Sequence, residues 1–146
     1  MRTSEVGIAF IKGWEGFRGE AYQDSVGVWT IGYGHTMSVK PGDTITEENA
    51  AALLKAELIG YENTVERVVS EELAQHEFDA LVSLCYNIGG NNFSRSSVVR
   101  LIAAGDRPRA ADAFLLWGKA TVNGKLTPLK GLLNRRKAER LVFLGK

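Results

Sequence analysis

Two carboxylic acids and a hydroxyl near the start of the chain could share one reaction site. Glu15 falls where a short amphipathic helix is predicted to end, Asp24 lies in a polar loop, and Thr30 lies on a run rich in β-branched and aromatic residues. Two carboxyls on different elements can face each other across a cleft. The pattern favours glycoside hydrolysis, in which one acid protonates the leaving oxygen and one carboxylate serves the water or the developing cation.

Each of these residues also has an ordinary structural explanation. Glu15 alone is typical of a surface residue at a helix end, Asp24 of a residue that shapes a turn, and Thr30 of a strand residue. Glu15 follows Trp14 and precedes Gly16 and Phe17. A carboxyl in apolar surroundings tends to hold its proton, as a general acid must. The order and spacing of the three residues therefore carry the chemical hypothesis.

That spacing resembles a known family. Glu, eight residues, Asp, five residues and Thr, followed by Ile-Gly-x-Gly-His-Thr, is similar to the phage-type lysozymes of the T4 and lambdoid endolysin group, glycoside hydrolase family 24. Similar blocks follow at Ala80–Gly89, Ala110–Trp117 and Gly131–Arg140, so the resemblance covers nearly the whole chain. Four ordered blocks are a far more specific signal than the catalytic triplet alone.

The resemblance implies both an activity and a mechanism. The expected reaction is hydrolysis of the β-1,4 bond between N-acetylmuramic acid and N-acetylglucosamine in bacterial peptidoglycan, for host cell lysis and without a cofactor. The implied mechanism is inverting, with Glu15 as the acid and Asp24 as the base or electrostatic stabiliser. The Thr30 hydroxyl would then help to hold the attacking water.

Three further residues are expected to bind substrate: Asn87, Tyr33 and Arg135. Asn87 ends a predicted helix, where the family resemblance implies an amide near the cleft, although a helix cap is an equally good interpretation. Arg135 aligns with a family arginine that can pair with the catalytic Glu. Such pairing would favour the ionised form of Glu15 and oppose the effect of burial, and the sequence leaves this balance open.

The histidines indicate neither a metal site nor a cofactor site. His35 is expected to be structural and to tie the sheet together, and His76 to be an exposed helix residue. Two distant histidines and one cysteine do not make a zinc-binding pattern. The pair Gly32-x-Gly34 lacks the third glycine of a dinucleotide fingerprint. We therefore expect no metal and no cofactor.

The cysteine and the tryptophans are predicted to lie in the core. Cys85 falls on an apolar helical face, which is typical of a small core residue. Trp14, Trp29 and Trp117 are expected to be core residues rather than sugar platforms, because large aromatic side chains are mostly buried. A single cysteine allows no intramolecular disulfide, which suits a reducing cytoplasm.

The composition predicts one compact unit. The chain has 146 residues, 45% hydrophobic and 24% charged, within the usual range for one domain. The net charge of +1 is uneven, with 8 basic and 15 acidic residues over 1–106, and 10 basic and 2 acidic over 107–146. The basic final part could meet an anionic polymer or be a solvated helix face. A nucleic-acid binder is a weaker hypothesis, since no nucleic-acid motif accompanies the charge.

The N-terminal sequence indicates neither a signal peptide nor a membrane anchor. Its apolar run is interrupted by Glu5 and Lys12 and is too short to span a bilayer. We therefore expect a monomer that does not insert stably into the membrane. It is expected to collect in the host cytoplasm and to reach the cell wall with the help of a holin.

The predicted fold is α+β and lysozyme-like. A small antiparallel β lobe (about 15–45) and a larger helical lobe (about 60–146, with helix 3–15) are joined by a long helix, with the cleft between them. The predicted segments are helices 3–15, 46–68, 74–88, 96–104, 107–117 and 131–144, a sheet within 17–39 and a hairpin tip at Asn123-Gly124.

Three local signals set the predicted ends of helices. The spacing from Thr44 to Glu47 predicts a capping box before helix 46–68. The run Gly89-Gly90-Asn91-Asn92 is expected to stop helix 74–88. Asp106 is expected to cap helix 107–117, with Pro108 in its first turn.

The alternative to an enzyme, a non-catalytic wall-binding module on the same fold, would gain nothing from the Glu-Asp-Thr triplet.

Overall fold

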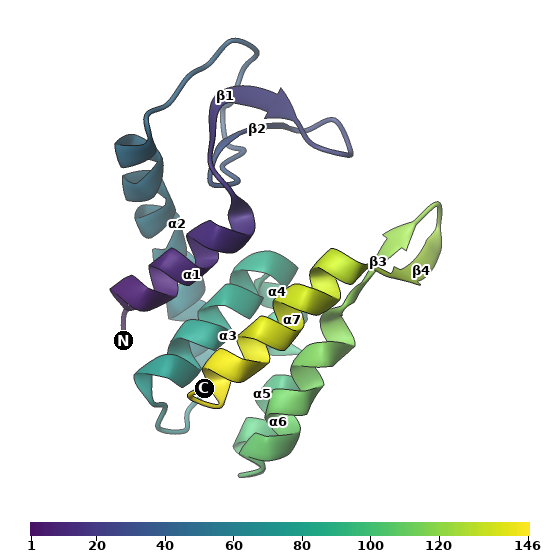
Figure 1. Cartoon of the computed structure of the whole chain (residues 1–146). Helices are drawn as coiled ribbons and strands as arrows, with labels where there is room; N and C mark the ends of the chain where they lie inside the picture. The colour runs from purple at the N-terminus through teal and green to yellow at the C-terminus, as the bar shows by residue number, and fades with distance from the viewer.

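The structure, a computed structural model, describes residues 1–146 and has an α+β fold. Figure 1 shows the β1–β2 hairpin at one end, the helices α3 to α7 at the other, and α2 running between them. In chain order the elements are α1 (Glu5–Glu15), β1 (Arg18–Gln23), β2 (Trp29–Gly32), α2 (Glu47–Val68), α3 (Gln75–Ile88), α4 (Gly90–Ser94), α5 (Ser97–Ala103), α6 (Arg107–Ala113), the 3₁₀ helix η1 (Phe114–Trp117), β3 (Lys119–Val122), β4 (Lys125–Pro128) and α7 (Lys130–Phe143).

Helix α3 is the centre of the core. It packs against α1, α2, α4 and α7, and its residues Glu77 to Cys85 are all buried. Phe78, Leu81 and Cys85 lie on the apolar face that the sequence predicts, and each is fully buried. Burial raises the pKa of the Cys85 thiol to about 12, so the thiol stays protonated near neutral pH. The prediction that Cys85 is a core residue is confirmed.

The first residues of the chain hold α1 against α2 and α3. Ser4 caps α1 by accepting the N–H of Gly7, and its own N–H donates to Asp79 Oδ1 at 3.0 Å. Thr3 Oγ1 donates to Glu62 at 2.5 Å. A Cβ atom at Gly7 would lie 2.6 Å from Asp79 Cγ, so only glycine allows this approach. These contacts hold the start of α1 against α2 and α3, and this helps to fix the position of Glu15 at its end.

Strands β1 and β2 form the antiparallel hairpin that the sequence predicts. Tyr22 pairs with Thr30 and Gln23 with Trp29. Gly27 lies in the connecting turn with φ +86°, a conformation that glycine adopts without strain. The hairpin is joined to α2 through His35, whose Nδ1 lies 2.8 Å from a carboxylate oxygen of Glu57. This contact agrees with the structural role expected for His35.

The predicted capping box at Thr44 is wrong by two residues. Thr46 is the N-cap of α2, and its hydroxyl accepts the N–H of Asn49 at 3.1 Å. Thr44 instead forms a β-bridge with Glu20. The Glu47 carboxylate accepts hydrogen bonds from Tyr33 and Lys12. Tertiary contacts therefore occupy the Thr44 backbone and the Glu47 carboxylate, which a capping box starting at Thr44 would need.

Two other predicted helix ends differ from the structure. Gly89, with φ +89°, ends α3 as expected, but a short helix, α4, begins at once with Gly90. Its Phe93 side chain is fully buried, so packing holds a turn of helix that the glycine-rich sequence disfavours. The predicted helix 107–117 ends its α-helical part at Ala113 and continues as η1. Asp106 caps α6 by accepting the N–H of Arg109, as predicted.

Most arginines in the basic final part of the chain are buried or paired with acidic residues of the protein. Arg135 and Arg136 are buried, Arg107 pairs with Glu77, and Arg140 pairs with Asp112. The exposed lysines of this part, which form no ion pairs, are Lys119, Lys125, Lys130, Lys137 and Lys146. The surface that an anionic polymer could meet is therefore much smaller than the sequence count indicates.

Replacing Thr46 with Ala should lower the free energy of unfolding by about 1 kcal/mol, because the first turn of α2 loses its side-chain cap. Thr44→Ala is the matched control, since its hydroxyl makes no side-chain hydrogen bond in the structure, and it should cost clearly less. Urea unfolding followed by circular dichroism measures both values. An equal or larger loss for Thr44→Ala would contradict the assignment of the cap.

Candidate active site

Glu15 lies at the end of α1, where Gly16, with φ +72°, lets the chain leave the helix. Its side chain is 17% exposed, and Oε2 accepts a 2.7 Å hydrogen bond from Arg135 Nη1. A Cβ at Gly34 would lie 3.1 Å from the other oxygen, Oε1, and 3.7 Å from the Tyr86 hydroxyl. Glycine at position 34 therefore leaves room beside the Glu15 carboxyl.

A cavity of about 500 Å³ opens beside Glu15. It lies between the last turn of α1, the end of α3 and the start of α7, and it is lined by Trp14, Glu15, Asn87, Leu129, Gly131, Leu132 and Arg135. Three of the residues expected at the site, Glu15, Asn87 and Arg135, thus share one cavity. The leucines at the start of α7 were not predicted here, since their apolar type indicates core as readily as a cleft wall.

Trp14 corrects a prediction. Its side chain is 38% exposed and lines the cavity beside Glu15, whereas the sequence predicts a core residue. The last turn of α1 extends beyond the part of the helix that Ile8 and Ile11 bury against the core. Trp14 therefore contacts only Phe10 among the aromatic rings and leaves a large apolar face beside the cavity.

Asp24 lies in the turn between β1 and β2 and is half-buried. Its Oδ1 accepts the N–H groups of Val26 and Val28 at 2.9 and 2.8 Å. The other oxygen, Oδ2, makes no hydrogen bond within the protein. The interpretation of Asp24 as a turn-shaping residue therefore accounts for one carboxylate oxygen and leaves the second available for chemistry.

Thr30 lies on β2 and is 5% exposed. Its hydroxyl donates to the carbonyl of Val28 at 3.0 Å, and the N–H of the same Val28 donates to Asp24. Asp24 and Thr30 are therefore coupled through one backbone residue of the hairpin. Movement of the turn would displace both side chains together.

The other two expected binding residues have different surroundings. The Tyr33 hydroxyl donates to Glu47 at 2.9 Å, and burial together with this hydrogen bond raises its pKa. The Tyr33 side chain is buried and does not line the cavity beside Glu15. Asn87 is exposed in that cavity, and its Oδ1 accepts a 2.9 Å hydrogen bond from Arg136 rather than capping α3.

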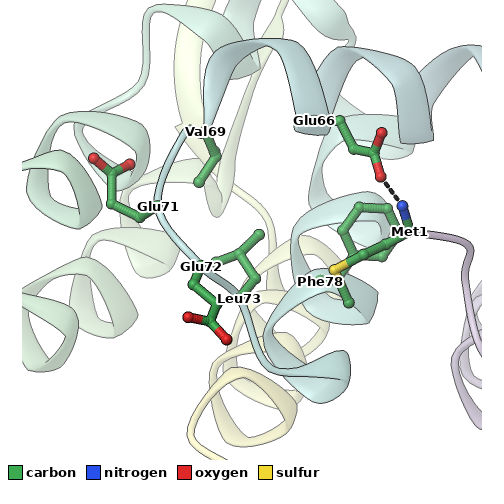
Figure 2. Close-up of a pocket in the computed structure, with 7 residues that line it drawn as sticks. All are labelled: Met1, Glu66, Val69, Glu71, Glu72, Leu73 and Phe78. Atoms are coloured by element: carbon green, nitrogen blue, oxygen red, sulfur yellow. Dashed lines mark ion pairs between the residues drawn. The ribbon is translucent and has the colours of Figure 1, made fainter.

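A second depression lies near the start of α1. It is lined by Met1, Glu66, Val69, Glu71, Glu72, Leu73 and Phe78, and Figure 2 shows the ion pair between the Met1 amino group and Glu66. It shares no residue with the cavity beside Glu15, and an 11-residue helix of about 16 Å separates Met1 from Glu15. No group of three or more His, Cys, Asp or Glu side chains lies close enough to hold a metal ion.

This α+β fold, with an arginine-paired carboxylic acid in a cavity and a second carboxylate on a β-hairpin, defines a glycoside hydrolase of the lysozyme type. The family model described as phage lysozyme matches residues 12–139, and the chain belongs to this family. The predicted lysozyme-like fold is therefore confirmed. No helix in the structure combines the length and the apolar character needed to cross a membrane.

Several relatives match this chain over nearly their full length. The endolysin of Salmonella phage P22 is 44% identical over 150 residues, covering 99% of both chains. The endolysin from Escherichia coli O157:H7 phage FAHEc1 has a similar structure, with a TM-score of 0.96 and 39% identity over 99% of this chain and 94% of that chain. The muramidase domain of SpmX from Asticaccaulis excentricus gives a TM-score of 0.93 and 41% identity over 98% and 97% of the two chains.

Asp24→Asn should leave stability close to wild type, because the amide oxygen can still accept the N–H groups of Val26 and Val28. Asp24→Ala removes the acceptor and should cost about 1 kcal/mol. Thermal unfolding of both variants measures the difference. If the two variants unfold alike, the turn does not depend on these hydrogen bonds. If they differ as expected, Asp24→Asn becomes a folded variant in which only the charge is changed.

Proposed function

We propose that this chain is an endolysin that hydrolyses the β-1,4 bond between N-acetylmuramic acid and N-acetylglucosamine in peptidoglycan. The observation that carries the proposal is the Glu15 carboxyl, held by Arg135 in a cavity that also contains Trp14 and Asn87. The cavity has a carboxylic acid at one side and an exposed aromatic face and an amide at others. A sugar-binding hydrolase needs such groups together with a second carboxylate, and in this proposal Asp24, which does not line this cavity, supplies it from the β1–β2 turn.

The proposed roles follow the chemistry of the groups. Glu15 protonates the glycosidic oxygen, and Asp24 acts through Oδ2 as the base or electrostatic stabiliser. Thr30 keeps the hairpin geometry through Val28 and helps to hold the water. Asn87 offers its amide N–H groups to substrate, and Arg135 orients Glu15. In this proposal Tyr33, expected to bind substrate, has a supporting role instead, because its side chain is buried and its carbonyl accepts a hydrogen bond from Tyr86 at 3.2 Å.

We infer a finer placement from the motif spacing. The chain falls in the T4 and lambdoid group, glycoside hydrolase family 24, and its 146 residues act as one catalytic domain with a β-rich lobe at about 15–45. In this proposal it is a monomer that collects in the host cytoplasm and depends on a holin to reach the wall. A non-catalytic wall-binding module would not need an acid paired with a buried arginine.

Glu15→Gln tests the proposed acid. The variant keeps the shape of the side chain but cannot donate the proton, so lytic activity should fall by several orders of magnitude. The assay is the loss of optical density of Gram-negative cells with permeabilised outer membranes, with mass spectrometry of the released fragments. The control is Glu48→Gln, an exposed Glu on α2 without an ion pair, which should keep full activity. Substantial lysis by a folded Glu15→Gln protein would contradict the assignment.

The stereochemistry of the product tests the proposed water attack. Inverting enzymes keep their carboxyl groups ~6.5–9.5 Å apart so that water can enter, whereas retaining enzymes hold them ~5–5.5 Å apart. We expect the longer separation and an α-anomeric first product from the β-linked chain, because a nucleophilic Asp24 would not need Thr30 to share a water. Proton NMR of early product, read before mutarotation, measures the anomer. A β-anomer, or a glycosyl adduct trapped on Asp24, would show that Asp24 attacks the sugar directly and would contradict the proposed attack by water.

A further inference from the structure

We propose that Glu139 is a positioning residue of the active site, which holds Arg135 and Arg136 in the core and shares the positive charge of Arg135 with Glu15. The role rests on the proposed function of Glu15 as the acid. It concerns a residue that does not itself line the substrate cavity, since Glu139 is fully buried behind Arg135. Its effect on the reaction would act entirely through the two arginines.

The Glu139 carboxylate accepts hydrogen bonds from side chains of two helices and lies beside two guanidinium groups. Its Oε2 accepts from Ser83 Oγ of α3 at 2.6 Å and from Arg135 Nε at 3.2 Å. Arg136 Nη2 also donates to Oε2, at 3.2 Å. The three contacts converge on one oxygen, so this carboxylate is a buried point at which polar groups of α3 and α7 meet.

Arg135 connects this buried group to the active site. One edge of its guanidinium, at Nε, faces Glu139, and Nη1 donates to Glu15 at 2.7 Å. The same guanidinium thus contacts both carboxylates. If the Glu139 charge were absent, Glu15 would be the only carboxylate that Arg135 contacts.

Arg136 is fully buried and lies beside the Glu139 carboxylate. Its Nε lies 2.8 Å from Glu139 Oε1 without the angle of a hydrogen bond, and its Nη1 has no partner. Its Nη2 donates to Asn87 Oδ1 at 2.9 Å. Glu139 therefore also fixes the arginine that orients Asn87 in the cavity, and this leaves the amide N–H groups of Asn87 free.

The charges in this group balance as a set. Two arginines face two carboxylates, Glu15 and Glu139. Tyr86 of α3 and Tyr61 of α2 also lie near Glu15, and both are neutral hydroxyls because burial raises their pKa. The Glu57 carboxylate of α2 acts on the same two tyrosines. Burial also raises the pKa of Glu139 and lowers that of Arg136, and the opposite charge of each partner resists these changes. A change of charge at Arg136 or Glu139 should therefore change the electrostatic potential at the Glu15 carboxyl.

The direction of the effect follows from the sign of the charge. Glu139→Gln removes a negative charge, so the arginines favour ionised Glu15 more strongly and the acid loses its proton at lower pH. Arg136→Met removes a positive charge and should act in the opposite direction. The double variant removes one charge of each sign and should return towards wild type. A residue that only supported the fold would not produce shifts of opposite sign.

The experiment is a pH titration of the Glu15 carboxyl by ¹³C NMR at constant ionic strength, together with the pH profile of wall lysis. We expect the titration midpoint and the alkaline limb of activity to move down by about 1 pH unit in Glu139→Gln and up in Arg136→Met. Asp112→Asn is the matched control, because it removes a carboxylate paired with the exposed side of α7 at Arg140. It should leave both readouts unchanged.

Each outcome is decisive for the proposal. Shifts of the same sign, or no shift in folded variants, would overturn the role of Glu139. If Glu139→Gln does not fold, the charge-balanced double variant and Arg136→Met still supply the comparison of sign. The NMR titration does not depend on activity, so a wild-type protein that fails to cleave walls would contradict the proposed function while leaving this test intact.

Discussion

Two guanidinium groups and a carboxylate are buried where α7 packs against α3, and the Glu15 carboxyl completes the set at the edge of the cavity. Removing such charges from water costs several kcal/mol per ion unless partners lie close by. The two helices therefore have little freedom to slide or rotate against each other. The same register that satisfies these charges brings Asn87, at the end of α3, into the cavity beside Glu15.

The long and periodic elements could be predicted from the sequence. The apolar positions of α3 recur at helical spacing, and Asn123-Gly124 marked the tip of the β3–β4 hairpin. Local errors arose where tertiary contacts decided between similar local signals. Thr44 and Thr46 are both good capping residues, and only the contacts of Glu20 and Glu47 select Thr46.

Among the buried charges, Arg135 was named from the sequence as a partner of Glu15, whereas Arg136 and Glu139 were not identified. The run Arg135-Arg136-x-x-Glu139 reads as a solvated helix face, because arginine and glutamate are almost never fully buried without partners. The partner on α3, Ser83, lies more than fifty positions earlier in the chain and has no distinctive pattern. In contrast, the order of Glu15, Asp24 and Thr30 was visible, although which oxygen of Asp24 is engaged depends on the shape of the turn.

Helix α3 has no solvent-facing side over the nine residues from Glu77 to Cys85. An isolated helix of this kind would expose apolar side chains together with Glu77, Asp79 and Ser83, whose partners lie on other elements, so it is not expected to persist before its neighbours are in place. Its amide hydrogens can exchange with solvent only when α1, α2 and α7 separate from it, which amounts to unfolding the whole helical part. The β1–β2 turn, exposed and held by few contacts, can open far more often. Amide hydrogen exchange should therefore be slow in α3 and fast in the β1–β2 turn, which includes Asp24.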